Sequence, residues 1–385
     1  MKITGIICEY NPLHLGHKKQ LDIVRKENPD GGIVCLMSGN FVQRGMPAIV
    51  GKMVRAEAAV NCGADLVLEL PVTYVLSSAE GFAKGGVKIL APFCDHLCFG
   101  AETGNKDTLM ALAKALLSED FSGHLKAELE KGVSFPVARQ KALENMGLDA
   151  SLLSLPNNIL AVEYCKAILS AGHDLEPMVI TREGNYHDNT PDTENPSATS
   201  IRKLMRDGLD WKSYIPVEAI PTLEHTPLHH IQHGERAILS KLRTMTDAEF
   251  AALPYGSEGL WRKLMHSARK ESTLEAVLEA TKSKRYTRTR LDRMVLCAFL
   301  GITQEMLDSP APYVRVLAFN DKGRQILKEA RKFGNFPNIG ENQEHAYQAL
   351  EDRCGDLYGL FSKVPEAPGA EQNHRVYYKK NGEVE

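Results

Sequence analysis

Two histidines surround a leucine and a glycine near the start of the chain, in the order His14-Leu15-Gly16-His17. The apolar run at residues 3–8 predicts a strand before them, and apolar residues at helical spacing predict a helix over residues 17–26. A turn from a strand into a helix offers free backbone N–H groups and the positive end of the helix dipole, which together favour a phosphate. Two imidazoles three residues apart can face one anion, and a glycine lets the backbone come close to it. At an arbitrary position, two surface histidines beside a loop glycine would be the better interpretation.

A second candidate anion site lies far along the chain, at Ser197-Ala198-Thr199-Ser200-Ile201-Arg202. Hydroxyls at the start of a helix cap its backbone N–H groups, and an arginine on the first turn adds a charged donor. Taken alone, this segment is simply a good helix N-cap. Paired with the histidine motif in this order, it predicts a second anion site that faces the first.

The elements that would position these motifs predict a doubly wound α/β domain. Strands are predicted at residues 3–8, 32–37, 65–70, 96–99 and 178–182. Helical patterns lie between them at residues 17–26, 53–62, 78–90, 107–117 and 159–169. This alternation requires crossover connections, hence a mainly parallel sheet covered on both faces. Because ligands of such sheets lie beyond the carboxyl ends of the strands, the loops after the strands should carry the chemistry.

The pattern changes near residue 215, where Pro216, Pro221 and Pro227 mark a linker. Helical patterns dominate from there onward, with one β-like run at residues 313–319. The sequence therefore predicts two domains. Residues 1–215 would form a Rossmann-like domain around the parallel sheet, and residues 216–385 a mostly helical domain.

The composition is that of a globular protein. The 385 residues include 46 Lys and Arg against 49 Asp and Glu, a net charge of −3, which argues against a surface coated for nucleic acid but permits a local basic patch. No apolar run reaches the roughly 18 residues of a membrane helix, and the polar first segment does not fit a signal peptide, so we expect a cytoplasmic protein. Eight cysteines without a Cys-x-x-Cys pair predict reduced core thiols.

The histidine motif resembles the HxGH signature of the nucleotidyltransferase superfamily, and Ser197 to Arg202 resembles the second signature of that superfamily. Further segments are similar to the tRNA(Met) cytidine acetate ligase family of bacteria: Ser38-Gly39-Asn40-Phe41-Val42-Gln43-Arg44-Gly45, Gly63-Ala64-Asp65-Leu66-Val67-Leu68-Glu69-Leu70-Pro71, Phe99-Gly100-Ala101-Glu102, Pro156-Asn157-Asn158-Ile159-Leu160-Ala161, Tyr186-His187-Asp188, Lys284-Arg285-Tyr286-Thr287-Arg288-Thr289-Arg290 and Tyr313-Val314-Arg315-Val316-Leu317. The similarity covers nearly the entire chain. It departs at Leu15, where a polar residue is expected, at Gly51, where an acidic residue is expected, and at Trp261-Arg262, where the family usually has Glu-Asn.

The resemblance implies a Rossmann-like nucleotidyltransferase domain and an RNA-modifying ligase. Such an enzyme uses ATP to activate acetate as acetyl-adenylate and acetylates N4 of the wobble cytidine, position 34, of elongator tRNA(Met), releasing AMP and diphosphate. It implies ATP, acetate and this tRNA as partners, with Mg²⁺ expected beside ATP, no metal held by protein side chains, no membrane and no protein partner. A small-molecule adenylyltransferase would use the same histidines but would not need the helical extension. A catalytically inactive RNA-binding relative is the third alternative, against which intact His14, Gly16, His17 and Arg202 argue.

The resemblance also assigns site residues by position. His14, His17 and Arg202 would be catalytic, and Ser197, Thr199, Ser200 and Arg202 would bind phosphate. The ATP shell would comprise Ile7, Cys8, Glu9, Tyr10, Asn11, Pro12, Leu13, His14, Leu15, Gly16, His17, Lys18, Lys19, Gln20, Gly100, Asn157, Arg182 and Glu183. Ser38, Gly39, Asn40, Gln43 and Arg44 are the candidates for acetate, because the segment combines a tight turn with donors to a small carboxylate. Without the family, Gly100 is an ordinary turn glycine, Asn157 an N-cap and Arg182 a surface ion-pair partner.

Contact with tRNA is expected in a basic segment of the second domain, through Lys282, Lys284, Arg285, Tyr286, Arg288, Arg290 and Arg293. Its tyrosine could stack on a splayed base, although a charge run is as often a solvated face. Lys52 and Arg55 would hold phosphate or RNA, or else lie on a solvated helix face. The histidines at 225, 229, 230 and 233 suggest zinc only weakly, because no carboxylate or thiol completes the set.

Overall fold

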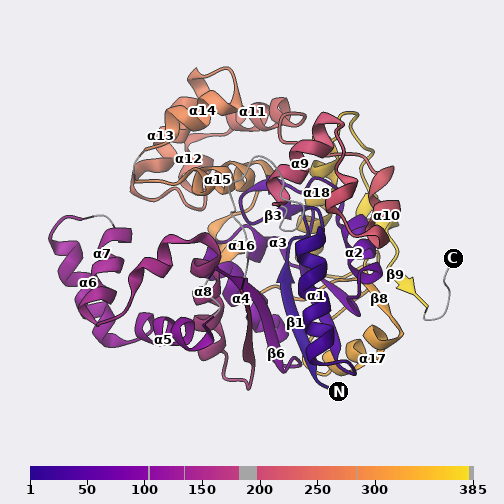
Figure 1. The fold of residues 1–385 in the computed structure, drawn as a ribbon. Helices are drawn as coiled ribbons and strands as arrows, with labels where there is room; N and C mark the ends of the chain where they lie inside the picture. The colour runs from indigo at the N-terminus through magenta and orange to yellow at the C-terminus, as the bar shows by residue number, and fades with distance from the viewer. Residues whose placement is uncertain (103–104, 134, 182–196, 284, 381–385) are drawn as a thin grey trace.

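The computed structural model describes residues 1–102, 105–133, 135–181, 197–283 and 285–380. Its centre is a seven-stranded sheet in the order β7-β6-β1-β2-β5-β8-β9 (Figure 1). Five neighbouring strands run parallel: β1 (Ile3–Cys8), β2 (Gly32–Ser38), β5 (Leu66–Leu70), β6 (His96–Ala101) and β7 (Glu176–Thr181). Each overlaps one of the predicted strands, so the α/β architecture with a parallel sheet is confirmed.

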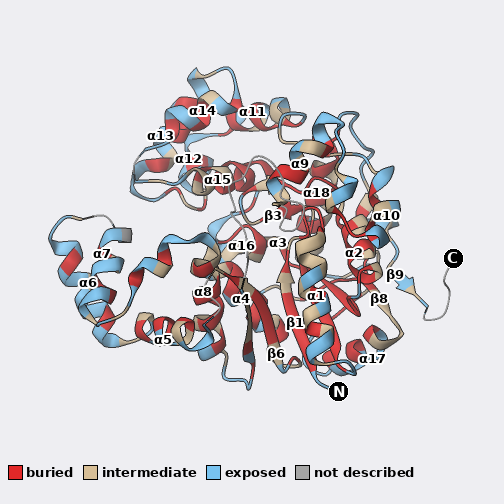
Figure 2. Cartoon of the chain, in the orientation of Figure 1, coloured by how far each residue is buried: buried red, intermediate tan, exposed pale blue. Residues whose placement is uncertain are grey.

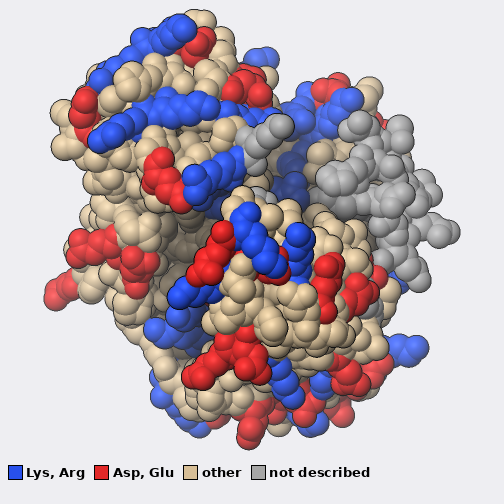
Figure 3. All heavy atoms as spheres, turned by 90° about the vertical axis from the view of Figure 1, so that its left-hand side faces the viewer, with Lys and Arg blue, Asp and Glu red and all other residues tan. Residues whose placement is uncertain are grey.

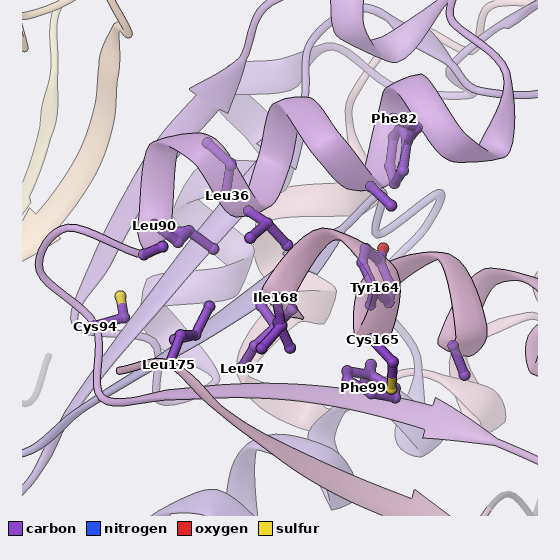
Figure 4. Packing of buried hydrophobic residues seen from close by; sticks show 14 of the residues in the cluster. Leu36, Phe82, Leu90, Cys94, Leu97, Phe99, Tyr164, Cys165, Ile168 and Leu175 are labelled. Atoms are coloured by element: carbon purple, nitrogen blue, oxygen red, sulfur yellow. The ribbon is translucent and has the colours of Figure 1, made fainter. Parts of the chain in front are cut away.

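Each face of the sheet has its own apolar core, because successive residues of a strand point to opposite sides. On β2, Val34 and Leu36 belong to one core, whereas Ile33, Cys35 and Met37 belong to the other. Four helices supply most of the apolar cover: α4 (Ala79–Leu90) and α8 (Pro156–Ala171) on the first face, shown in Figure 4, and α1 (Leu15–Glu27) and α2 (Lys52–Asn61) on the second. The sheet is therefore buried on both sides, as its parallel strands require.

Shorter elements fill the connections of this part of the chain. They are the hairpin β3 (Phe41–Val42) and β4 (Met46–Pro47), helix α3 (Val72–Val75), and a lobe beside α8 made of α5 (Lys106–Leu116), α6 (Glu119–Glu130), α7 (Phe135–Asn145) and η1 (Ala150–Ser154).

The later part of the chain is mostly helical, as predicted. Its helices are α9 (Ala198–Asp207), η2 (Lys212–Tyr214), η3 (Val217–Ala219), α10 (Ile220–Glu224), α11 (Glu235–Thr244), α12 (Asp247–Ala251), η4 (Ser257–Gly259), α13 (Leu260–Lys270), α14 (Leu274–Thr281), α15 (Arg288–Leu300), α16 (Gln304–Asp308), α17 (Asp321–Ala330), α18 (Ala346–Tyr358), η5 (Gly359–Phe361) and α19 (Ala370–Asn373). A third apolar core, with Leu264, Val277 and Leu296 among its members, lies between helices α11, α12, α13, α14, α15 and α18.

Two late strands return to the sheet of the first part. β8 (Val316–Asn320), which overlaps the predicted β-like run, pairs antiparallel with β5, and β9 (Tyr377–Lys379) pairs parallel with β8. The expected division at residue 215 therefore does not coincide with the end of the sheet. Local sequence cannot reveal this, because the pairing joins strands some 250 residues apart.

The burial pattern agrees with the expected thiols. All eight cysteines are buried and free of disulfides. Figure 2 shows how buried residues dominate the strands of the central sheet. Among the described residues, no helix combines the length and apolar character needed to cross a membrane.

Candidate active site

The loop between β1 and α1 is anchored on both sides before it reaches the histidines. Tyr10 is 1% exposed, with φ at +44°, and its hydroxyl lies 3.4 Å from Cys35 Sγ. Asn11 precedes a cis proline, and its side-chain Oδ1 accepts a hydrogen bond from Ile49 N at 2.7 Å. Glu9 Oε1 accepts another from Gln43 N at 2.7 Å. These contacts fix where α1 begins.

His14 and His17 form a reciprocal cap at the start of α1. His14 Nδ1 accepts from Gly16 N at 3.1 Å, and His14 N donates to His17 Nδ1 at 3.3 Å. The two rings stack with centroids 3.8 Å apart. Because Nδ1 is the acceptor in both rings, Nε2 carries the proton in each neutral imidazole and is the nitrogen able to donate to an anion.

Gly16 has a role beyond the one expected from the sequence. A Cβ at this position would lie 3.0 Å from His14 Cε1 and 3.2 Å from His14 Nδ1. A side chain there would press on the His14 ring, so the glycine preserves the arrangement of the histidine pair.

The second motif lies against the first. Ser197 is the N-cap of α9, and its Oγ accepts from Ser200 N at 3.1 Å. Arg202 donates to the Asn11 carbonyl at 2.7 Å and to Thr199 Oγ1 at 3.0 Å. Two segments 191 residues apart in sequence thus meet beside one helix N-terminus.

Other residues of the expected ATP shell lie on α1, β6 and α8. Gln20 on α1 approaches the Cys98 carbonyl of β6 at 3.5 Å, and Gly100 lies two residues further along that strand. Asn157 is the second residue of α8, and both its backbone N and its Nδ2 donate to Glu102, at 3.1 and 2.7 Å. Lys18 and Lys19 lie on the first turns of α1, and Lys18 pairs with Asp22. Arg182 and Glu183 lie outside the described residues.

Glu102 is a residue that sequence reasoning did not assign. Besides Asn157 it accepts from Asn158 N at 2.7 Å, so one carboxylate caps α8 from the end of β6. The signal was present, since Glu102 closes one of the segments that carry the family resemblance.

The acetate candidates do not all converge on one point. Ser38 ends β2 and is fully buried, and its Oγ has no hydrogen-bond partner in the described part of the chain. Asn40 Oδ1 accepts from Lys52 N at 3.0 Å. Gln43 and exposed Arg44 lie instead in the turn between β3 and β4, where the Gln43 carbonyl accepts from Arg293 at 3.3 Å. Gly39 lies between Ser38 and Asn40 and beside Glu69. A Cβ added at Gly39 would lie 2.2 Å from Glu69 Oε1.

Arg55 is a structural residue, so both interpretations offered for it from the sequence are wrong. It is fully buried, and among the described residues its guanidinium donates to four backbone carbonyls: those of Glu9 at 2.7 Å, Ser38 at 3.1 Å, Val50 at 3.0 Å, and Gly39. Burial lowers the pKa of Arg55. The side chain ties together the carboxyl ends of β1 and β2, the edge from which the histidine loop departs.

Lys52 is likewise buried, within a cluster of five charged side chains. Its Nζ lies 3.0 Å from Glu69 and 2.6 Å from Glu371, while Arg315 contacts Glu69 at 2.8 Å, Glu371 at 2.9 Å and Glu351 at 3.3 Å. Burial raises the pKa of Glu351 to about 7, and a protonated Glu351 would balance the two cations against two carboxylates. The cluster connects α2, β5 and β8 with α18 and α19, which no local pattern predicts.

A small cavity lies within this cluster, next to Gly39 and Asn40. Its volume of about 20 Å³ has room for a single water molecule. The cluster therefore packs against the Ser38–Asn40 turn.

The arginines of the basic segment are already engaged by neighbours. Arg288 pairs with Glu275 at 2.6 Å, Asp292 at 2.9 Å and Glu279 at 3.4 Å, and the hydrogen bond to Glu275 is the main reason that its pKa is raised. Arg290 donates to the Tyr255 carbonyl at 2.8 Å.

Other members of this segment differ in exposure. Arg285 and the Tyr286 hydroxyl both contact Glu258, at 2.8 and 2.9 Å. Lys282 is exposed and lies 3.5 Å from Glu279, whereas Arg293 is 8% exposed and so does not belong to the surface. Lys284 lies outside the described residues.

The four histidines of the linker do not assemble a metal site. No group of three or more His, Cys, Asp or Glu side chains suited to a metal occurs in the described ranges of the chain. His229 instead stacks on Tyr358 with centroids 4.0 Å apart, and burial lowers its pKa.

Known proteins resemble this chain in sequence and in fold. Residues 1–373 match the HIGH Nucleotidyl Transferase family. The chain is 39% identical over 364 residues to the tRNA(Met) cytidine acetate ligase of Clostridium novyi, covering 88% of this chain and 89% of that protein. It is 36% identical over 388 residues to the protein of the same name from Clostridium acetobutylicum, covering 94% and 96%. The crystal structure of Thermotoga maritima TmcAL bound with alpha-thio ATP superposes with a TM-score of 0.88 at 28% identity, over 99% of this chain and 100% of that one.

Proposed function

The chain belongs to the tRNA(Met) cytidine acetate ligase family of HIGH nucleotidyl transferases, and we propose that it catalyses the reaction for which those relatives are named. In this reaction, acetate attacks the α-phosphate of ATP, diphosphate leaves, and the resulting acetyl-adenylate passes its acetyl group to N4 of the wobble cytidine of elongator tRNA(Met), releasing AMP. The observation that carries the proposal is the contact between the two anion-binding motifs, Arg202 against Asn11 at the loop that presents His14 and His17.

The residues suit the first step. Hydroxide is a very poor leaving group, so acetate needs activation, and AMP in a mixed anhydride leaves readily. Negative charge builds on the departing diphosphate, and fixed donors aimed at it lower the barrier because they need no reorganisation. We assign this role to Nε2 of His14 and His17 and to Arg202, with Ser197, Thr199 and Ser200 at the start of α9 as further donors.

The other ligands are assigned by position. The adenosine part of ATP would lie along β6, near Gly100 and Asn157, with Arg182 and Glu183 beside it. Acetate would lie at the Ser38–Asn40 turn, which Arg55 and the buried charge cluster hold in place. Mg²⁺ would arrive with the triphosphate and neutralise part of its charge. Lys282, Arg285, Tyr286, Arg288 and Arg290 remain candidates for contact with tRNA.

One incubation tests the function. Purified protein, ATP, labelled acetate and unmodified bulk tRNA should give label in methionine tRNA alone. Pyrophosphate exchange without RNA separates the steps, because acetate-dependent exchange requires only the adenylation half of the reaction. Exchange that depended on a different acid would favour a small-molecule adenylyltransferase. No exchange with any carboxylate would favour an inactive RNA-binding relative.

A further inference from the structure

The solvent-facing side of α13 is entirely basic. Five residues of this helix are exposed: Arg262, Lys263, His266, Arg269 and Lys270. The helix contains no acidic residue, and its buried side, with Leu264 and Met265, packs into the third core. Among the ion pairs of the described residues, only Arg269 of these five has a carboxylate partner, Asp247 at 2.7 Å.

Local stability does not explain this arrangement. Cations in the last turn of a helix complement its dipole, which accounts for Arg269 and Lys270. Arg262 and Lys263 lie in the first turn, where the positive end of the dipole disfavours them. No carboxylate of the helix compensates for these two charges, and neither forms an ion pair within the described residues, so an external anion could neutralise both.

The basic face is continuous with the segment assigned to tRNA. Lys263 Nζ donates to the Lys282 carbonyl at 2.8 Å, which places α13 against the start of that segment. Arg262 lies over the Trp261 ring, 5.0 Å from its centroid, so its guanidinium is held in place before any ligand arrives. Figure 3 shows bands of Lys and Arg across the upper, helical part of this side of the molecule, above a hollow in the surface.

We propose that the exposed face of α13, formed by Arg262, Lys263, His266, Arg269 and Lys270, binds the phosphate backbone of tRNA. The proposal rests on the proposed function and moves the main electrostatic contact one helix away from the expected basic segment. Three carboxylates already surround Arg288 in that segment, and one pairs with Arg285, whereas the cations of α13 are largely unneutralised within the described chain. Phosphate contacts depend on such charge and not on base sequence.

Binding of bulk tRNA by two matched double variants tests the proposal. Arg262→Gln/Lys263→Gln removes two charges from the first turn of α13. Arg324→Gln/Lys328→Gln removes two exposed charges from α17, which lies at the opposite end of the molecule (Figure 1). The affinity of each is measured by fluorescence anisotropy over a range of salt concentrations, with thermal unfolding as a check on folding.

The α13 variant should bind tRNA more weakly at low salt. The plot of log K against log salt has a negative slope. Loss of two phosphate contacts should make this slope shallower by about 1.4 to 1.8, since each contact contributes roughly 0.7 to 0.9 to its magnitude. The α17 variant should keep the parent slope. Equal effects in both variants, or an unchanged slope in a folded α13 variant, would overturn the proposal.

Acetate-dependent pyrophosphate exchange by the unsubstituted chain tests the proposed function separately. If exchange is absent but the two slopes differ as stated, the proposed function fails and the tRNA surface stands. If exchange is present and the slopes do not differ, the proposal for the α13 face is contradicted and the proposed function stands.

Discussion

Arg202 donates a hydrogen bond to the backbone carbonyl of Asn11 over 2.7 Å, and so holds the start of α9 against the loop that leads to His14. The same guanidinium donates to Thr199 Oγ1 at 3.0 Å. Two N–H donors of the planar Arg202 guanidinium thus hold α9 and the histidine loop together. They also fix the positive charge of the guanidinium beside that loop. A lysine would keep the charge but could not reproduce this fork.

Substitution Arg202→Lys is therefore expected to slow adenylation. The rate of acetate-dependent pyrophosphate exchange should fall by about 10- to 100-fold, because two hydrogen bonds would no longer hold the positive charge in place. Arg206→Lys, on the exposed side of the same helix, serves as the control and should keep the parent rate. An Arg202→Lys enzyme as fast as the parent would show that charge alone suffices here.

The histidine pair gives a second prediction. His17→Ala removes one donor and also the Nδ1 that accepts from His14 N, so both members of the stacked pair are affected. Exchange should fall by about 100- to 1,000-fold, the usual effect of losing one preorganised donor to a developing anion. His173→Ala, an exposed histidine after α8, is the matched control. An unchanged exchange rate in His17→Ala would show that this motif takes no part in adenylation.

The sequence was sufficient for the parts of this site that are local. A strand, a turn with two histidines and a helix follow one another within the first 27 residues, so the pattern at His14 to His17 could be interpreted directly. The meeting of Arg202 with Asn11 could be expected only because the order of the two motifs resembles a known superfamily. Glu102 closes one of the segments that resemble the family, but its contact with α8 spans more than 50 residues and no local pattern predicts it.

Arg55 shows where such reasoning fails for charged residues. A cation on a helix is ordinarily exposed, and composition gives no sign that four carbonyls converge on this one. Arg55→Met should lower the free energy of unfolding by about 3 kcal/mol or more, because buried carbonyls lose their donors. Urea denaturation measures this, and exposed Arg324→Met should change it by no more than about 0.5 kcal/mol. A similar small effect at Arg55 would mean that water replaces its bonds.

The buried charge cluster was also beyond prediction, because its members are spread from residue 52 to residue 371. The cluster should make the stability of the fold depend on pH. Burial raises the pKa of Glu351 from the ordinary 4.5 to about 7, so between these values the folded protein holds a proton that the unfolded chain releases. Stability should therefore fall as pH rises through this window, by up to about 1.4 kcal/mol per pH unit from this group.

Glu351→Gln isolates the effect, since an amide keeps the acceptor for the Tyr313 hydroxyl, 2.8 Å from Oε2, and cannot ionise. Urea unfolding between pH 5 and 8 should give a flatter curve for this variant than for the parent. Exposed Glu305→Gln on α16 should retain the parent's decline. Parallel curves for the parent and Glu351→Gln would mean that Arg315 and Lys52 keep Glu351 ionised in the folded state, with the excess negative charge tolerated in the interior.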